Sequence, residues 1–70
     1  MSLTFQIETD REDDGRWIAE AVGLPGVLAY GNTRDEAIRY VEALALRVIA
    51  DRVESNEVTE RAMSVSFSAS

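Results

Sequence analysis

The 70-residue sequence predicts an α+β domain of the order β-β-β-α-β, in which a four-stranded mixed sheet carries one helix on one face. Three observations predict it. Apolar and polar residues alternate near both ends of the chain, two glycine-containing turns interrupt the first half, and an apolar stripe at helical spacing fills the middle. Because no repeat, linker or change in composition divides the chain, residues 1–70 are expected to form a single domain.

The first strand is predicted from residues 3–8, where Leu3, Phe5 and Ile7 alternate with polar side chains. A charged segment, DREDDG at 10–15, follows and ends in an Asp-Gly pair. Asp-Gly between two alternating segments is a strong hairpin signal, so the next strand should run antiparallel to the first.

That second strand is predicted over about residues 16–22. Trp17 shares one face with two alanines, whereas Ile18 and Val22 share the other face with Glu20. Because a glutamate prefers water, Trp17 is expected in the core, and Ile18 and Val22 on the outer face of the sheet.

A second reversal is predicted at residues 23–26 (GLPG). Pro25 presets φ and Gly26 accepts the positive φ of a type II turn. A short third strand then covers 27–30, and Gly31 with Asn32 is expected to break it.

A helix is predicted over about residues 34–54. Thr33 is the expected N-cap, and Glu36, three residues later, completes a capping box. An apolar stripe, most simply a core-facing surface, runs along this helix: Ala37, Val41, Leu44 and Val48, widened by Ile38, Ala45 and Ile49. Ser55 and Asn56 are expected to stop it.

A polar connection at 57–61 leads to a fourth strand at 63–68, where Met63, Val65 and Phe67 alternate with serines. A right-handed helical crossover places this strand beside the first and parallel to it, which predicts the sheet order 3-2-1-4. The opposite face of the sheet then has no helix to cover it. We expect it to carry Thr4, Gln6, Glu8, Ile18, Glu20, Val22, Ser64 and Ser66.

The composition narrows the functional classes. Thirteen acidic residues against seven arginines give a net charge of −6, which disfavours direct nucleic-acid binding and favours a basic partner. The absence of cysteine and histidine removes disulfides, thiolate zinc sites and the usual general base. No apolar run is long enough to span a membrane, and we expect a cytoplasmic protein.

Three segments together carry a family resemblance: DGRWIA at 14–19, LPGV at 24–27 and GNTRDEA at 31–37. In this order and spacing the sequence resembles the HicB-like antitoxin family of short domains, over nearly all of residues 3–50. The resemblance implies a partial ribonuclease-H-like fold. It also implies a partner, HicA, a small basic toxin that cleaves messenger RNA and whose active site the antitoxin covers. Many members carry a C-terminal DNA-binding domain. Because this sequence ends at Ser70, just after the expected fourth strand, we expect no such domain.

The acidic segment is the first candidate site, formed by Glu8, Asp10, Glu12, Asp13 and Asp14. It could dock a basic toxin surface and speed the encounter. Its opening resembles a calcium loop, but the position of the closing glutamate is occupied by Ala21, so a solvated hairpin turn is the simpler interpretation and no metal is expected. A two-metal nuclease is a more distant alternative, because Glu36 and Glu42 are better explained as a cap and a surface charge than as partners of Glu8.

The second candidate is a strip on the helix formed by Leu46, Ala50 and Val53 and flanked by Arg39 and Glu42. It lies roughly opposite the apolar stripe. It is either ordinary exposed surface or a narrow surface for self-association or partner binding. A homodimer is also predicted, through pairing of the uncharged edge strand 63–68 or through the uncovered sheet faces.

The sequence therefore predicts a non-enzymatic HicB-like antitoxin without a cofactor, which occludes a HicA-type toxin. The alternative is a stand-alone oligomeric scaffold or regulatory module of the same fold. The motif residues that carry the resemblance have structural explanations, as turns, core or cap: Gly15, Trp17, Pro25, Gly26, Gly31, Thr33 and Glu36.

Overall fold

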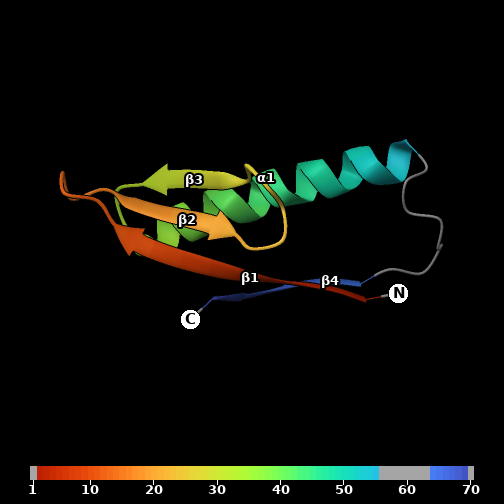
Figure 1. Ribbon diagram of the computed structural model, residues 1–70, viewed down its shortest axis with the longest axis horizontal. Coiled ribbons are helices and arrows are strands. Elements are labelled where there is room, and N and C mark those ends of the chain that lie inside the picture. Colours follow the sequence, from red (N-terminus) through yellow and green to blue (C-terminus); the bar gives the residue numbers. More distant parts are fainter. Residues whose placement is uncertain (1, 56–63, 70) are drawn as a thin grey trace.

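The computed structural model describes residues 2–55 and 64–69. Its elements are β1 (Ser2–Arg11), β2 (Trp17–Ala21), β3 (Leu28–Gly31), α1 (Arg34–Glu54) and β4 (Ser64–Ala69) (Figure 1). The strand order is β3-β2-β1-β4. β1 pairs antiparallel with β2 and parallel with β4, and β2 pairs antiparallel with β3. The predicted α+β topology is confirmed.

The first hairpin differs from the prediction in its bounds. β1 continues to Arg11, so Asp10 belongs to the strand and the turn is shorter than expected. The amide of Glu12 donates to the carbonyl of Arg16 (2.7 Å), and the amide of Gly15 donates to the carbonyl of Glu12 (2.9 Å). Three residues, 13–15, lie between the hydrogen-bonded Glu12 and Arg16, and Gly15 takes the left-handed conformation with φ of +91°.

The second reversal consists of two consecutive turns. Gly26 has φ of +79°, and the amide of Val27 donates to the carbonyl of Leu24 (3.1 Å), which confirms the predicted turn. Immediately before it, Gly23 has φ of +95°, and the amide of Leu24 donates to the carbonyl of Ala21 (3.2 Å). The double turn directs Leu24 and Val27 into the core, with exposed fractions of 2% and 5%. Neither residue belongs to the core that the sequence predicts.

The N-terminus of α1 carries the predicted cap in a modified form. The hydroxyl of Thr33 accepts a hydrogen bond from the amide of Glu36 (3.1 Å). The carboxylate of Glu36 accepts one in return from the amide of Asn32 (3.1 Å), one residue before the cap itself. The first bond satisfies a donor that the first helical turn leaves unpaired, and the second ties the residue before the cap to the helix.

The core lies between α1 and the sheet. α1 lies over β2 and β3 and has few contacts with β1. The helix contributes Ala37, Val41, Ala45 and Ile49 to the centre of the core, and Ile38, Leu44 and Val48 flank them. All seven belong to the predicted apolar stripe, but Ala45 and Ile49 take the central places that the sequence assigned to Leu44 and Val48. The sheet contributes fully buried Ile7, Ala19 and Ala21, with Trp17 partly buried against this core.

Three predicted features lie outside the described residues. β4 begins at Ser64, so Met63 of the predicted strand lies outside the described residues. The same holds for Asn56, one of the two predicted stop residues, and for the polar connection at 57–61. The other stop residue, Ser55, is the C-cap, and its amide donates to the carbonyl of Asp51 (2.9 Å).

Candidate interaction surface

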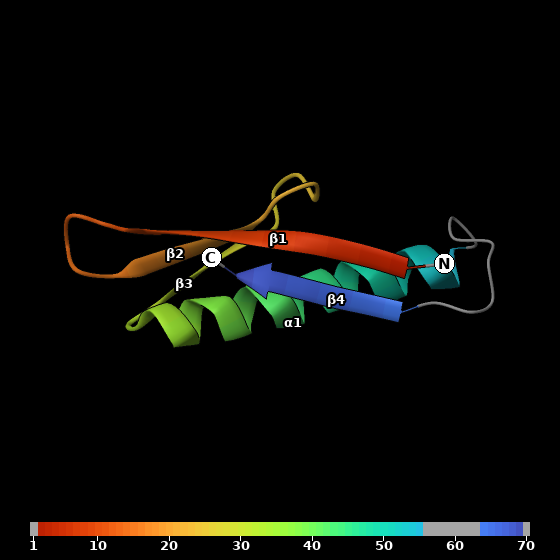
Figure 2. The same cartoon turned by 90° about the horizontal axis from the view of Figure 1, so that it is seen from below.

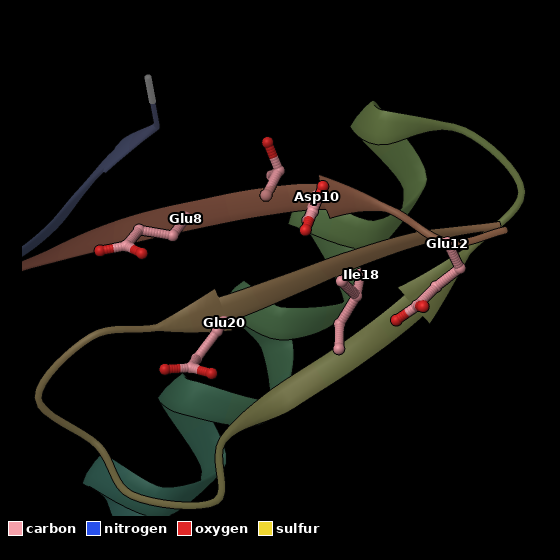
Figure 3. A pocket seen from close by; sticks show the side chains of 6 residues that line it. Glu8, Asp10, Glu12, Ile18 and Glu20 are labelled. Carbon is pink, nitrogen blue, oxygen red and sulfur yellow. The ribbon is translucent and has the colours of Figure 1, made fainter. Parts of the chain in front are cut away.

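The face of the sheet opposite α1 holds the main candidate site. The register places Glu8 directly opposite Glu20, and Asp10 opposite Ile18, on this uncovered face. Side chains from β1, β2 and their connecting turn line a depression of about 320 Å³, formed by Glu8, Thr9, Asp10, Glu12, Ile18 and Glu20 (Figure 3). Four carboxylates therefore surround one aliphatic side chain.

The pairing of Glu8 with Glu20 is unfavourable in the isolated chain. Directly opposite residues of an antiparallel pair have Cβ atoms about 5 Å apart, and like charges there destabilise the sheet. Among the described residues neither carboxylate has an ion pair within 4.0 Å. The acidic depression is therefore a site of negative potential that the fold itself does not neutralise.

Beside the depression, the same face becomes apolar. Val22, Leu28 and Tyr30 are 40%, 38% and 42% exposed. The register brings Leu28 beside Glu20 and Tyr30 beside Ile18. The predicted polar face with two aliphatic residues is thus correct for its strands but incomplete, because β3 adds Leu28 and Tyr30.

The far side of this face, on β1 and β4, is lined by hydroxyl groups. The hydroxyls of Ser2 and Ser64 are 2.9 Å apart, and those of Thr4 and Ser66 are 3.1 Å apart. These pairs join the two strands without charge. The uncovered face therefore has two halves. The half formed by β3, β2 and the C-terminal part of β1 is acidic and apolar, and the half formed by β4 and the N-terminal part of β1 is lined by hydroxyl groups.

The structure separates Asp14 from the other members of the acidic segment. Its carboxylate accepts hydrogen bonds from the amide (3.0 Å) and the guanidinium (2.7 Å) of Arg16. The backbone hydrogen bond from Arg16 is the main cause that lowers the pKa of Asp14 below its ordinary value of 3.8. The guanidinium of Arg16 also lies 4.6 Å from the centre of the Tyr30 ring. Asp14 thus stabilises the turn, and Asp13, exposed on the same turn, does not line the depression.

The alternative catalytic carboxylates do not converge. Glu8 lies on the face away from α1, whereas Glu36 and Glu42 belong to α1, so the sheet separates them. The calcium-loop interpretation also lacks support, since no group of three or more carboxylates in residues 2–55 and 64–69 could hold a metal ion.

The helix strip lies on the other side of the molecule. Leu46 and Val53 are 48% and 44% exposed, and Ala50 is exposed between them. They occupy the solvent side of α1, while the acidic depression faces away from the helix. The two sequence-predicted surfaces are therefore not brought together, and the strip remains a separate prediction.

The sequence matches no known family model and no curated protein, and the structure matches no solved structure. No helix in the described part of the chain combines the length and apolar character needed to cross a membrane. Any functional assignment must therefore be argued from the surface itself.

Proposed function

We propose that this chain is a HicB-like antitoxin domain that binds a basic HicA-type messenger-RNA-cleaving toxin and neutralises it by covering its active site. In this proposal the acidic and apolar half of the uncovered sheet face is the contact surface. The domain acts by binding alone and uses no cofactor.

The observation that supports the proposal is the combination of chemistry on that face. Protein interfaces commonly have an apolar centre with a polar or charged rim. Here Ile18, Leu28 and Tyr30 offer apolar contact area, and Glu8 and Glu20 border it. A basic partner is complementary to such a rim, whereas a phosphate backbone is repelled by it.

Glu8 and Glu20, which have no ion pair among the described residues, also favour a cationic partner on energetic grounds. Two like charges held opposite each other lower the stability of the free domain. A lysine or arginine placed between them would convert this repulsion into two attractive interactions. Binding therefore gains from a strain that is present before the partner arrives.

Co-expression with the candidate toxin tests the proposal. The partner is to be sought as a neighbouring reading frame encoding a basic chain with a histidine-containing, double-stranded-RNA-binding-like pattern. The expected result is a co-purified complex and loss of RNA cleavage in the presence of this chain. Full toxin activity at an excess of the chain would refute the antitoxin function.

A charge-matched pair of variants tests the surface. Glu8→Gln combined with Glu20→Gln should slow association roughly tenfold, because steering by opposite charge is lost. Asp51→Asn combined with Glu54→Gln removes the same charge from exposed positions on α1 and should leave association within about twofold. Equal effects of the two pairs would show that net charge, and not this face, controls binding.

The second candidate function is a stand-alone oligomeric scaffold or regulatory module. The uncharged outer edge of β4 favours it, since that edge can pair with another strand. If no neighbouring frame encodes a basic toxin and the chain self-associates, the scaffold becomes the better proposal.

A further inference from the structure

The two edges of the sheet differ in how they are protected. β3 is an edge of only four residues, and it is covered by α1 on its inner face. β4, the other edge, has six residues, SVSFSA, without a charge, proline or glycine. Proteins usually protect an edge with a short strand, a proline, a charge or a bulge, and the sequence of β4 provides none of these groups. Its outer backbone groups form a row that can accept another strand.

The core is covered less completely near β4, which lies beside β1 at the edge of the sheet (Figure 2). The helix lies over β2 and β3, so Leu3, Phe5, Val65 and Phe67 on the inner face of β1 and β4 are each only partly buried. The rings of Phe5 and Phe67 have centroids 6.1 Å apart and form the margin of the core. Further apolar contact at this margin would increase burial in a domain whose core is small.

We propose that β4 pairs antiparallel with β4 of a second copy of this chain across a two-fold axis. The two sheets then join into one of eight strands, four from each copy, with both helices on the same face. The inner faces of the two copies stay on the same side only if odd-numbered residues pair with odd-numbered ones and even-numbered residues with even-numbered ones, because side chains alternate between the faces of a strand. An axis on Ser66 and an axis on Phe67 each pair five residues of β4. We place the axis on Ser66 because it sets Val65 of each copy opposite Phe67 of the other, which makes two aliphatic–aromatic pairs across the strands.

The charge distribution supports a second copy of this chain as the partner that pairs with the edge of β4. β4 pairs with residues 2–7 of β1, and the acidic residues of β1 begin at Glu8, beyond the end of β4. Two copies with a net charge of −6 each can therefore meet at this edge through uncharged strands. The acidic depressions remain on the outer parts of the joined sheet, so this inference does not depend on the toxin.

The proposed centre at Ser66 allows a direct test with the isolated full-length chain. Ser66 faces away from α1 and is exposed, so charged substitutions there do not enter the core. Ser66→Glu and Ser66→Lys each place two like charges about 5 Å apart across the axis. Each variant alone should raise the dimer dissociation constant about tenfold or more. An equimolar mixture of the two should form a heterodimer at least as stable as the wild-type dimer.

Thr4→Glu is the matched control. Thr4 shares the face and the hydroxyl contact of Ser66 but lies one strand further in. In the proposed dimer its copies are three strand spacings apart, about 14 Å. That distance exceeds the screening length of about 8 Å at physiological salt, so the control should remain dimeric. A dimer built from the uncovered faces would be disrupted by both substitutions.

Light scattering and sedimentation at 10–100 µM, about the range for a modest homodimer, measure the outcome. The wild type should have twice the mass of one chain, and circular dichroism should show that every variant is folded. A monomeric wild type overturns the proposal. So does a Ser66→Glu variant that stays dimeric, or a mixture of the Ser66 variants that does not restore the dimer. Loss of toxin binding leaves all these results unchanged, so the two proposals fail separately.

Discussion

Gly31→Ala is expected to be among the most damaging single-methyl additions in this domain. A Cβ atom at Gly31 would lie 2.5 Å from the amide nitrogen of Ala37, 3.0 Å from the Cα atom of Ala37 and 3.0 Å from the carbonyl carbon of Glu36. All three atoms belong to the backbone at the start of α1. A flexible side chain could move aside, but a capped first helical turn packed on the sheet cannot do so without shifting the helix.

The size of the effect follows from this geometry. Overpacking by one methyl group typically costs 1–3 kcal/mol, and contact with backbone places Gly31→Ala at the upper end, about 3 kcal/mol. A domain of this length has a free energy of unfolding of roughly 4–10 kcal/mol. The substitution should therefore remove a large fraction of the stability and lower the melting temperature by about 12–24 °C.

Urea denaturation followed by circular dichroism measures the change, provided that the m-value stays constant. Gly15→Ala is the control, because Gly15 has nothing within 4 Å but has φ of +91°. It should cost about 1–2 kcal/mol for the left-handed conformation alone. If Gly31→Ala costs no more than Gly15→Ala, close approach is not the reason for glycine at position 31.

Three further predictions concern the loop, the acidic face and the hairpin turn. Leu24→Ala should lower the free energy of unfolding by about 2–5 kcal/mol, because Leu24 is buried in the core. The control Val22→Ala, on the exposed face, should change it by less than about 0.5 kcal/mol. Similar losses in the two variants would contradict the structure of the loop. Glu20→Gln should raise the free energy of unfolding by about 0.5 kcal/mol, because it relieves the repulsion from Glu8. This gain should vanish in 1 M salt, which screens the two charges. A gain that does not depend on salt would show that charge repulsion is not its cause. Because the pKa of Asp14 is lowered in the folded state, its contribution to stability is present above an unfolded-state pKa of 3.8 and is lost as the pH falls through the folded value. Asp14→Asn should therefore destabilise the domain at pH 7 but not at pH 2, as measured by urea titration; equal destabilisation at both would show that ionisation is not involved.

Much of the fold could be predicted because local and tertiary preferences agree. The alternation in Leu3, Phe5 and Ile7 predicts a strand with one buried face, and that face is the one that meets the core. Thr33 and Glu36 predict the start of α1 to the residue, because capping is a local interaction within four residues. The order of the sheet followed from two hairpins and the handedness of the crossover.

The candidate site was less predictable, because it depends on register. Of the predicted acidic segment, Glu8, Asp10 and Glu12 line the depression, whereas Asp13 and Asp14 do not. Glu8 and Glu20 were predicted on the same face, but only the register of β1 and β2 sets these residues, twelve apart in the chain, directly opposite each other. The number of residues in the hairpin is a signal for this register, but it can be used only once Glu12 and Arg16 are known to be its closing pair.

The sequence by itself determined the elements, their caps and turns, and the sheet order, since these depend on side-chain periodicity and on backbone preferences of glycine, proline and threonine. Only the tertiary structure decided which residues of different elements contact one another. It buried Leu24 under a double turn and made Gly31 a point of close approach to α1. It also placed α1 over β2 and β3, so Val65 and Phe67 on the inner face of β4 are only partly buried. Such contacts join residues distant along the chain, and no local preference specifies the distance or the face at which they meet.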